Sequence, residues 1–556
     1  MVQQRGAFAS VVPGSHQSIP ASGDPFSQRR PKQDVINGPV VSVPLLNVVV
    51  LPHEFPNLAA SERAARRKTQ NRDAIHLVGL GCVSCRGVCG QEDEKMSKPS
   101  IPKGTRDFGP QVMARRNWMF DAMRGAFERF GFQPIETPAM ENLSTLTGKY
   151  GEEGDQLIFR ILNNGDYLAK ADASALAAHD AKALTPSISK KALRYDLTVP
   201  FARFVVMSRN DLHFPFRRYA MANVWRGDRP GKGRYQEFTQ CDADIIGTDS
   251  LLCELELVEL FHAVLSALNV PNYRIMMNDR RVLSGLAKAW GAEEQVGELL
   301  VALDKLDKIG PAGVDAELVQ RGLGDQARNG VKSLVEVTQI ADPFEQLYAV
   351  GEMLAADETA LAGLHDLKWL LGQARAAGVP QEALCFDVTL ARGLDYYTGA
   401  IFEVRVVDSP VGSICGGGRY ADLTGIFGWP GMSGVGISFG ADRIYDVLSH
   451  FDAFPEGLEV SIDAMICRLD EDDAAVAHDL GALRLLRAAG LKAEMYPDAA
   501  KLKKQMKFAA DRNVPWVMLS GTAEREQGKF TLKNMASGEQ VVVDAEGAID
   551  AIRSAI

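Results

Sequence analysis

The chain has 556 residues, too many for one hydrophobic core, so its length predicts three or four folded units. Hydrophobic residues make up 46% and charged residues 24%, as in ordinary soluble globular proteins, and the longest apolar stretches fall short of the roughly 18 residues that a membrane helix needs. A formal net charge of -10 argues against nucleic-acid binding by bulk attraction, so any RNA contact requires a local basic patch.

Residues 1–95 differ in composition from everything that follows. They are rich in Pro, Ser, Gln and Arg and lack helical or strand periodicity, so we expect no compact fold. Two interpretations stay open: a disordered targeting leader, against which the acidic residues and prolines argue, or a reading frame that really starts at Met96. Cys82, Cys85 and Cys89 are close enough in sequence to bind a metal ion together. No second pair of ligands follows them, so we expect no metal site.

The elements after Met96 alternate between helix and strand. Apolar residues at three- and four-residue spacings predict a helix over residues 112–130, and Gly131 ends it. Residues 132–138 then predict an extended strand. Residues 191–247 predict short strands and turns of a mainly antiparallel sheet, followed by a helix over residues 251–268.

The second half of the chain predicts two further units. Residues 279–378 are almost wholly helical in pattern, which indicates an inserted helical domain. After a linker at residues 451–458, strands and helices alternate, which predicts a small α/β layer fold. The predicted strands are residues 462–467, 493–496, 516–519, 530–532 and 541–543, and the predicted helices are residues 474–489 and 499–511.

Three segments carry arginines in settings that suit phosphate chemistry. Residues 224–235 run Val-Trp-Arg-Gly-Asp-Arg-Pro-Gly-Lys-Gly-Arg-Tyr between two predicted strands, and residues 392–397 read Arg-Gly-Leu-Asp-Tyr-Tyr. Residues 434–443 form a glycine-spaced strand that runs into a helix at Arg443. A guanidinium group binds phosphate bidentately and keeps its charge. Each segment alone also fits an ordinary role, such as an exposed hairpin tip or an Arg–Tyr stack.

Taken together and in this order, the three segments resemble the histidyl-tRNA synthetases, a branch of the class II aminoacyl-tRNA synthetases. The resemblance runs from about Ile101 to the C-terminus. It implies that Arg226 and Arg392 are catalytic and meet the α-phosphate of ATP from opposite sides. It also implies a set of ATP-binding residues, in which Asp228 stands where the wider class has Glu: Arg226, Asp228, Arg234 and Arg443. Asp442 likewise replaces a usual Glu.

The same resemblance implies a histidine pocket. Gln240 and Asp244 are four residues apart, so both side chains point to one face of a strand. In this family, Asp244 and Tyr397 would meet the imidazole, and the α-ammonium group would lie against three residues: Asp196, Thr198 and Gln240. Tyr396 and Tyr420 complete the expected pocket. A pocket that pairs both ring nitrogens would reject other side chains, because they would leave its polar groups unpaired.

The expected fold is therefore α+β, with a class II antiparallel sheet, a helical insertion and a C-terminal α/β anticodon-binding domain. The expected domains are residues 1–95 as the leader or mis-annotated start, 96–278 and 379–450 as the two parts of the catalytic domain, 279–378 as the insertion, and 459–556 as the anticodon-binding domain. Within the last, residues 501–508 form a basic helix with one aromatic residue, suited to RNA.

The implied activity is ATP-dependent attachment of histidine to tRNA(His) through a histidyl-adenylate, with Mg²⁺ accompanying ATP. We expect a cytoplasmic homodimer whose partners are ATP, L-histidine and tRNA(His), with no membrane contact. Two alternatives differ in class: an inactive paralogue that regulates histidine biosynthesis, and a synthetase-like sensor of uncharged tRNA. The paralogue usually lacks the C-terminal unit, and the sensor normally accompanies an effector domain.

Overall fold

The chain divides into two units, residues 1–95 and residues 96–556. The computed structural model describes residues 98–148, 151–231, 233–354, 356–391, 393, 396–420 and 422–555. For residues 151–153 and 307 it describes the backbone alone. The first unit, with its three cysteines, thus lies outside the described residues. In the described part, no helix is long and apolar enough to cross a membrane.

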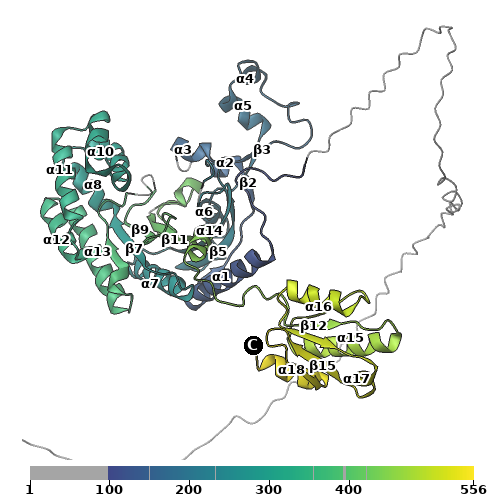
Figure 1. The fold of residues 1–556 in the computed structure, drawn as a ribbon. Helices are drawn as coiled ribbons and strands as arrows, with labels where there is room; N and C mark the ends of the chain where they lie inside the picture. Colours follow the sequence, from purple (N-terminus) through teal and green to yellow (C-terminus); the bar gives the residue numbers. More distant parts are fainter. Residues whose placement is uncertain are drawn as a thin grey trace, which may run out of the picture. The chain divides into compact units, whose positions relative to one another are not determined.

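An eight-stranded sheet forms the centre of the larger folded part (Figure 1). The strand order is β1-β5-β6-β11-β10-β9-β7-β8, and only the outer pairs β1/β5 and β7/β8 are parallel. This antiparallel-rich sheet among helices confirms the predicted α+β class. The strands are β1 Gln133–Pro134, β5 Phe216–Trp225, β6 Glu237–Ile246, β7 Tyr273–Asp279, β8 Leu384–Phe386, β9 Ala400–Val406, β10 Cys415–Tyr420 and β11 Gly434–Gly440.

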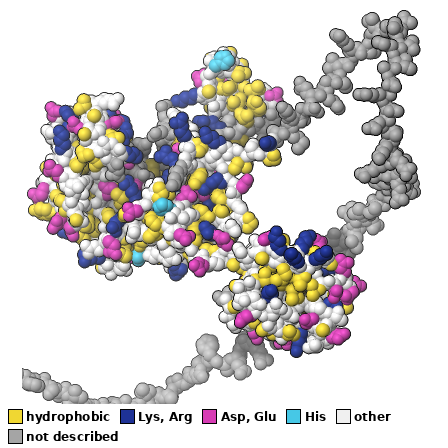
Figure 2. Space-filling view, in the orientation of Figure 1, with side chains coloured by type: hydrophobic (Ala, Val, Ile, Leu, Met, Phe, Trp, Pro, Cys, Tyr) yellow, Lys and Arg dark blue, Asp and Glu magenta, His cyan; other side chains and the backbone are white. Residues whose placement is uncertain are grey.

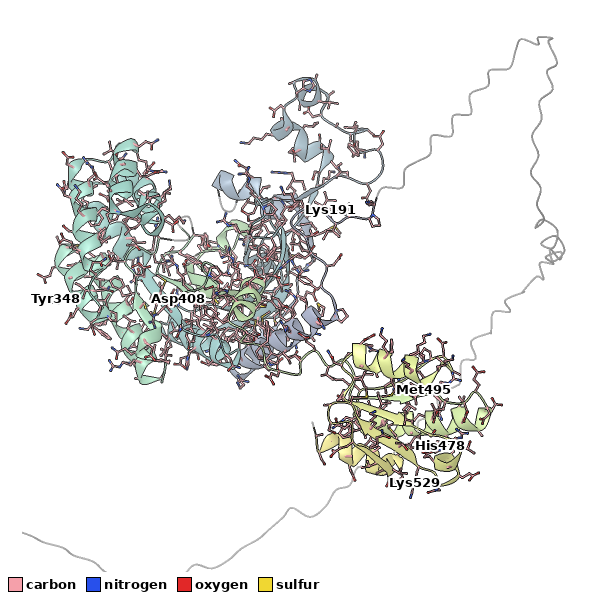
Figure 3. All side chains as sticks on the ribbon, in the orientation of Figure 1. Lys191, Tyr348, Asp408, His478, Met495 and Lys529 are labelled. Atoms are coloured by element: carbon pink, nitrogen blue, oxygen red, sulfur yellow. The ribbon has the colours of Figure 1, made fainter. Side chains whose placement is uncertain are left out.

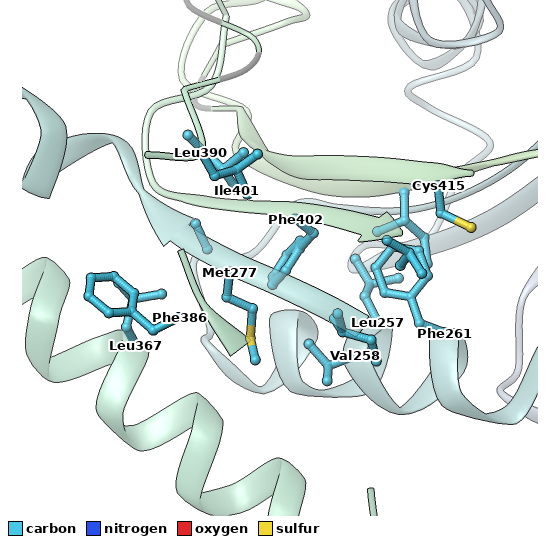
Figure 4. Packing of buried hydrophobic residues seen from close by; sticks show 14 of the residues in the cluster. Leu257, Val258, Phe261, Met277, Leu367, Phe386, Leu390, Ile401, Phe402 and Cys415 are labelled. Atoms are coloured by element: carbon cyan, nitrogen blue, oxygen red, sulfur yellow. The ribbon is translucent and has the colours of Figure 1, made fainter. Parts of the chain in front are cut away.

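One face of this sheet is covered by helices and forms the main hydrophobic core. The covering helices are α1 Pro110–Arg129, α7 Leu252–Ala267 and α14 Ala441–His450. The ring centroid of Phe261 of α7 lies 5.3 Å from that of Phe439. It lies 6.4 Å from the ring centroid of Phe402 (Figure 4). Successive side chains of a strand point to opposite faces. Because Cys241, Ala243 and Ile245 of β6 belong to this core, the even-numbered β6 residues face the other side.

The predicted first helix is confirmed as α1, and Gly131 follows it with a left-handed φ of +76°. The predicted strand over residues 132–138 is wrong in length. Only Gln133–Pro134 pair with β5, as an edge strand. Pro134 and Pro138 have no N–H to donate, so they restrict further pairing.

Residues 140–207 form a small sheet with short helices. Residues 191–247 were predicted as strands and turns, but α6 lies within them, because Phe201 and Val205 are four residues apart and bury the same helix face. Pro200 is tolerated since it lies in the first turn. The elements are β2 Met140–Asn142, α2 Leu143–Leu146, α3 Gly151–Gln156, β3 Arg160–Ile161, α4 Ala173–Ala177, α5 Ala181–Ile188, β4 Lys191–Leu193 and α6 Thr198–Met207.

Helices fill the stretch between the neighbouring strands β7 and β8 (Figure 1). α13 packs against α7, α8 and β7, so this helical stretch is anchored on the sheet. Gly285 of α8 permits the close approach, because a Cβ there would lie 2.4 Å from Cβ of Ala360. The elements are α8 Arg280–Ala289, η1 Glu293–Gln295, α9 Val296–Leu303, α10 Leu306–Gln320, α11 Asp325–Val337, α12 Pro343–Met353 and α13 Glu358–Ala376.

The C-terminal part is a separate five-stranded sheet of order β13-β12-β14-β15-β16, flanked by helices. All five predicted strands are confirmed. In this part, His478 stacks on Phe530 with ring centroids 4.3 Å apart. His478 also lies near Lys529 (Figure 3). The elements are β12 Ala464–Cys467, α15 Asp473–Ala488, β13 Ala493–Met495, α16 Leu502–Asp511, β14 Trp516–Leu519, α17 Thr522–Glu526, β15 Phe530–Asn534, β16 Gln540–Val543 and α18 Ala545–Arg553.

Candidate active site

Two adjoining cavities, of about 410 and 790 Å³, lie on the face of the large sheet opposite the helical core. Their walls share residues from the loop between β5 and β6, from β6 itself and from the segment after Gly393, so they form one continuous cleft. The shared residues are Leu157, Arg226, Asp228, Arg234, Gln240, Tyr396, Tyr397, Gly416 and Ser438.

The smaller cavity is lined by all four residues predicted to bind ATP: Arg226, Asp228, Arg234 and Arg443. Arg226 follows the end of β5, where its Nε donates to the Tyr195 carbonyl at 2.9 Å and its guanidinium lies 5.3 Å from the Phe238 ring centroid. Arg443, in the first turn of α14, donates from Nη1 to the Ser413 carbonyl at 2.6 Å. Both guanidinium groups are therefore held in fixed directions at the cavity wall.

Asp442 also lines the smaller cavity, but protein partners use its carboxylate. Arg116 Nη1 lies 2.6 Å from Oδ1, and the Thr239 backbone N–H donates to Oδ2 at 2.8 Å. Arg106 forms a further ion pair with the same carboxylate. Asp442 thus ties α1, β6 and α14 together beneath the cavity.

The larger cavity is lined by all seven residues predicted to bind histidine: Asp196, Thr198, Gln240, Asp244, Tyr396, Tyr397 and Tyr420. Asp196 lies just before α6, and its Oδ1 accepts the Val199 backbone N–H at 3.2 Å. Gln240 Nε2 donates to Ser438 Oγ across β6 and β11 at 2.8 Å. Segments distant in sequence thus meet at one cavity.

Glycines of β10 and β11 leave room for the aromatic side chains of this cavity. A Cβ at Gly434 would lie 2.5 Å from the Tyr420 ring, and a Cβ at Gly418 would lie 2.8 Å from the Tyr397 ring. Gly393 has a φ of +66° and would place a Cβ 2.1 Å from Tyr397. No other residue fits these positions without moving a pocket tyrosine.

A buried ion pair underlies the larger cavity. Arg218 is fully buried, with Nη2 2.6 Å from Asp244 Oδ2 and 3.9 Å from Asp242 Oδ2. The Tyr420 hydroxyl donates to Asp244 Oδ1 at 2.9 Å. Burial raises the pKa of Tyr397 and Tyr420 well above the usual value, so both phenols stay neutral hydrogen-bond donors at neutral pH.

Comparisons with known proteins identify this arrangement. The family model for histidyl-tRNA synthetase matches residues 186–444, and the model for an anticodon binding domain matches residues 464–555. A histidine–tRNA ligase of Cytophaga hutchinsonii is 50% identical over 449 residues, which cover 81% of this chain and 98% of the relative. The chain belongs to the histidyl-tRNA synthetase family. The ligase of Porphyromonas gingivalis is 49% identical over 453 residues, with coverages of 82% and 98%.

Solved structures agree with this family assignment. The crystal structure of histidyl-tRNA synthetase from Nostoc sp. PCC 7120 has a TM-score of 0.69 and 30% identity and covers 82% of this chain and 99% of its own. An ATP phosphoribosyltransferase regulatory subunit/histidyl-tRNA synthetase from Bacillus halodurans C has a TM-score of 0.62 at 21% identity, with coverages of 76% and 100%. The second likeness shows the shared fold alone.

Several side chains at the cleft of this synthetase escaped the sequence analysis. Asp242 and Ser438 line the larger cavity, and Arg218 lies beneath it against Asp244; their positions opposite or two residues from Asp244 and Gln240 on paired strands were the available signal. The helical insertion also lines the larger cavity, through Val301, Asp304, Lys305 and Lys308. No local pattern indicated that contact. The predicted catalytic Arg392 lies outside the described residues.

The predicted basic helix of the C-terminal part is α16. Figure 2 shows Lys and Arg side chains gathered over it, and the exposed lysines are Lys501, Lys503, Lys504 and Lys507. Phe508 is half-buried and meets Tyr496 edge-on, with ring centroids 5.2 Å apart. The lysines therefore form a charged surface, while the aromatic ring is packed inside the domain.

Proposed function

We propose that the chain is a histidine–tRNA ligase, which first forms histidyl-adenylate from histidine and ATP and then transfers the histidyl group to the terminal ribose of tRNA(His). The carrying observation is the continuous cleft, with an arginine-lined cavity beside one lined by acids and phenols. Such an arrangement suits a triphosphate next to an amino acid. It brings the carboxylate and the α-phosphorus together for in-line attack.

Charge stabilisation on the α-phosphate falls to Arg226 and Arg392 in this proposal. Arg226 lines both cavities, as a residue at the reacting junction must. A preorganised guanidinium stabilises the negative charge that develops on the equatorial oxygens during attack. Asp228, Arg234 and Arg443 contact the remainder of ATP, and their shared lining of the smaller cavity supports these roles.

Histidine recognition is divided between its two ends. Asp196, Thr198 and Gln240 receive the α-ammonium group, and Asp244 and Tyr397 meet the imidazole. The Arg218 ion pair supports an acceptor role for Asp244, because a paired carboxylate stays ionised more readily than an isolated buried one. Tyr396 and Tyr420 complete the walls.

Magnesium enters as part of the ATP substrate. Among the described residues, no cluster of three or more His, Cys, Asp or Glu could form a protein cage for a metal. Of the acids at the smaller cavity, Asp442 is bound by arginines, whereas Asp228 lines the wall beside Arg234. Mg²⁺ characteristically keeps waters and phosphate oxygens as ligands, so one such acid suffices. Bound Mg²⁺ neutralises phosphate charge during adenylation.

The domain roles follow the expected ranges. Residues 96–278 and 379–450 carry adenylation, residues 279–378 lie against the cleft as the insertion, residues 459–556 bind the anticodon region, and residues 1–95 contribute nothing to catalysis. Support comes from the cleft lining, from the anticodon-binding match over residues 464–555 and from the lysines of α16. Phosphate contacts from lysines supply sequence-independent affinity for RNA.

We further assign a cytoplasmic homodimer. Figure 2 shows apolar side chains exposed over α4 and α5. The large apolar side chains exposed on the small sheet and the helices around it are Met140, Leu162, Leu168, Leu176 and Met207. Exposed apolar patches characteristically mark protein interfaces. Replacing Leu168 and Leu176 by aspartate should shift the sedimentation coefficient to that of a monomer. The matched control is Tyr348→Asp, which changes an exposed residue on α12 (Figure 3).

The deciding experiment for the activity is ATP–pyrophosphate exchange dependent on L-histidine. Exchange with histidine and none with other amino acids, followed by charging of tRNA(His), is the expected result. A chain that binds histidine without exchange would be the inactive regulatory paralogue. Binding of uncharged tRNA without any exchange would indicate the sensor.

A further inference from the structure

Two buried hydrogen-bond acceptors in the larger cavity lack donors. Gln240 Oε1 and Asp242 Oδ1 are buried and accept no hydrogen bond from any described residue. Both residues line the larger cavity, and they are two positions apart on one face of β6. A buried acceptor without a donor costs free energy, so this pair indicates a ligand that brings N–H groups.

The charges beneath the cavity are also unequal. Among the described residues, Arg218 is the cation that pairs with these two carboxylates, and its Nη2 lies 2.6 Å from Asp244 Oδ2 but 3.9 Å from Asp242 Oδ2. Asp242 is 2% exposed, so its carboxylate is held out of water, with the Ser438 hydroxyl as a neutral partner and Arg218 as a distant charged one. One guanidinium balances one carboxylate, and a cationic ligand group would balance the second.

We propose that Asp242 is a further histidine-binding residue, whose free oxygen accepts a hydrogen bond from the α-ammonium group, and that Arg218 is a positioning residue that holds Asp242 and Asp244 in place. This inference deepens the proposed function and rests on it. The ammonium group carries three N–H donors and a positive charge, so it can donate to the two unpaired acceptors and balance the charge of the Asp242 carboxylate. Asp242 lies next to Gln240 on the ammonium side, whereas Asp244 is bound by Tyr420.

Neighbouring contacts favour the ammonium over the imidazole as the partner of Asp242. Ser438, the register partner of Asp242 on β11, accepts from Gln240 Nε2 at 2.8 Å. Burial raises the pKa of Asp242 to about 7, and the negative charges of Asp244 and Asp196 add to this rise. Asp196 is itself expected at the ammonium group, and Asp196, Gln240 and Asp242 all line the same cavity.

The test compares ligands with and without the amino group on the full-length protein. Calorimetry measures the dissociation constants of L-histidine and of imidazole-4-propionate, which lacks the amino group, for the wild type and for Asp242→Asn. This variant keeps the shape of the side chain and removes its charge. Loss of a charged hydrogen bond should weaken histidine binding about ten- to a hundred-fold and leave imidazole-4-propionate binding nearly unchanged. A purely structural role would weaken both ligands equally.

Matched variants make each outcome decisive. Asp479→Asn makes the same change at a buried aspartate of the C-terminal part, where Ser520 Oγ donates to it at 2.7 Å, and should leave both dissociation constants unaltered. Arg218→Lys keeps the cation and should weaken histidine binding less than Arg218→Met.

A third ligand, 2-thiazolylalanine, keeps the amino group and lacks the ring N–H. If Asp242→Asn instead reduces the difference between the dissociation constants of histidine and 2-thiazolylalanine, Asp242 contacts the ring and the proposal is overturned. If Asp242→Asn weakens the binding of all three ligands equally, or weakens none of them, the proposal is overturned as well. Wild-type protein without histidine-dependent exchange would refute the proposed function itself, so the two failures are distinguishable.

Discussion

Asp244 and Gly436 face each other across β6 and β11, and a Cβ on Gly436 would lie 2.0 Å from Asp244 Oδ1. That oxygen also accepts the Tyr420 hydroxyl, while the other oxygen meets Arg218. The Asp244 carboxylate therefore cannot move away from a side chain at position 436 without losing one of these partners. The missing side chain at position 436 is therefore a condition for this position of the Asp244 carboxylate.

Gly436→Ala should therefore raise the KM for histidine more than about tenfold in the exchange reaction, because the methyl group displaces the Asp244 carboxylate from its partners. The KM for ATP should change little, since Gly436 lines only the larger cavity of the two. Gly412→Ala is the control, because a Cβ there meets nothing within 4 Å. Equal KM values in Gly436→Ala and the wild type would mean that Asp244 does not contact histidine.

Arg226→Ala should lower kcat for exchange on the order of a hundredfold or more, because a preorganised charge at the α-phosphate acts mainly in the transition state. The KM for histidine should change far less. Arg217→Ala, which removes a half-exposed arginine of β5 that pairs with Glu256, should leave exchange intact. Arg392→Ala should resemble Arg226→Ala, and a normal kcat in a folded Arg392→Ala protein would remove that residue from catalysis.

The pH dependence of stability should differ between the wild type and Asp242→Asn. Burial raises the pKa of Asp242 to about 7, above its ordinary value, so the folded state keeps a proton that the unfolded state has already lost. Because of this group, the wild-type free energy of unfolding should fall as pH rises toward about 7. The groups that face Asp242 are Arg218 from β5, Asp244 from β6, Ser438 from β11 and Asp196 from the loop before α6.

Asp242→Asn removes this pH-dependent loss of stability. The free energy of unfolding of the variant minus that of the wild type should therefore increase by about 2 kcal/mol between about pH 5 and about pH 7. Urea denaturation of both proteins across that range measures the difference, in which other titrating groups cancel. The variant would then be more stable and bind histidine less tightly. A difference that stays constant with pH would show that Asp242 does not titrate in this range.

Removing residues 459–556 should leave histidine-dependent exchange largely intact, because the described residues that line the cleft all lie upstream. Charging of tRNA(His) should fall sharply, since contacts to the anticodon side contribute binding energy and orientation.

The milder variant replaces Lys503, Lys504 and Lys507 by alanine. It should weaken tRNA binding and flatten its dependence on salt concentration, as measured by filter binding at several ionic strengths. Glu526→Ala and Glu539→Ala are surface controls from the same domain. Full charging by the truncated protein would contradict an RNA-binding role for the C-terminal part.

Local sequence patterns determined a large part of this protein. The helix α1, the five C-terminal strands and the three arginine-bearing segments were all predictable, because periodicity and glycine positions act within a few residues. The family resemblance, and not a local pattern, indicated the seven residues expected to bind histidine, all of which line the larger cavity. Spacing alone accounts for Gln240 and Asp244, which share a strand and therefore lie on the same face of it.

Only the tertiary structure decided which distant residues meet. Arg218 reaches Asp244 because β5 pairs with β6 in one register, and Asp442 binds Arg116 because α1 packs beside the start of α14. Lys305 and Lys308 reach the larger cavity only through the packing of the helical insertion. Such contacts depend on strand order and helix packing across the whole sheet, and a chain of local propensities does not carry that information.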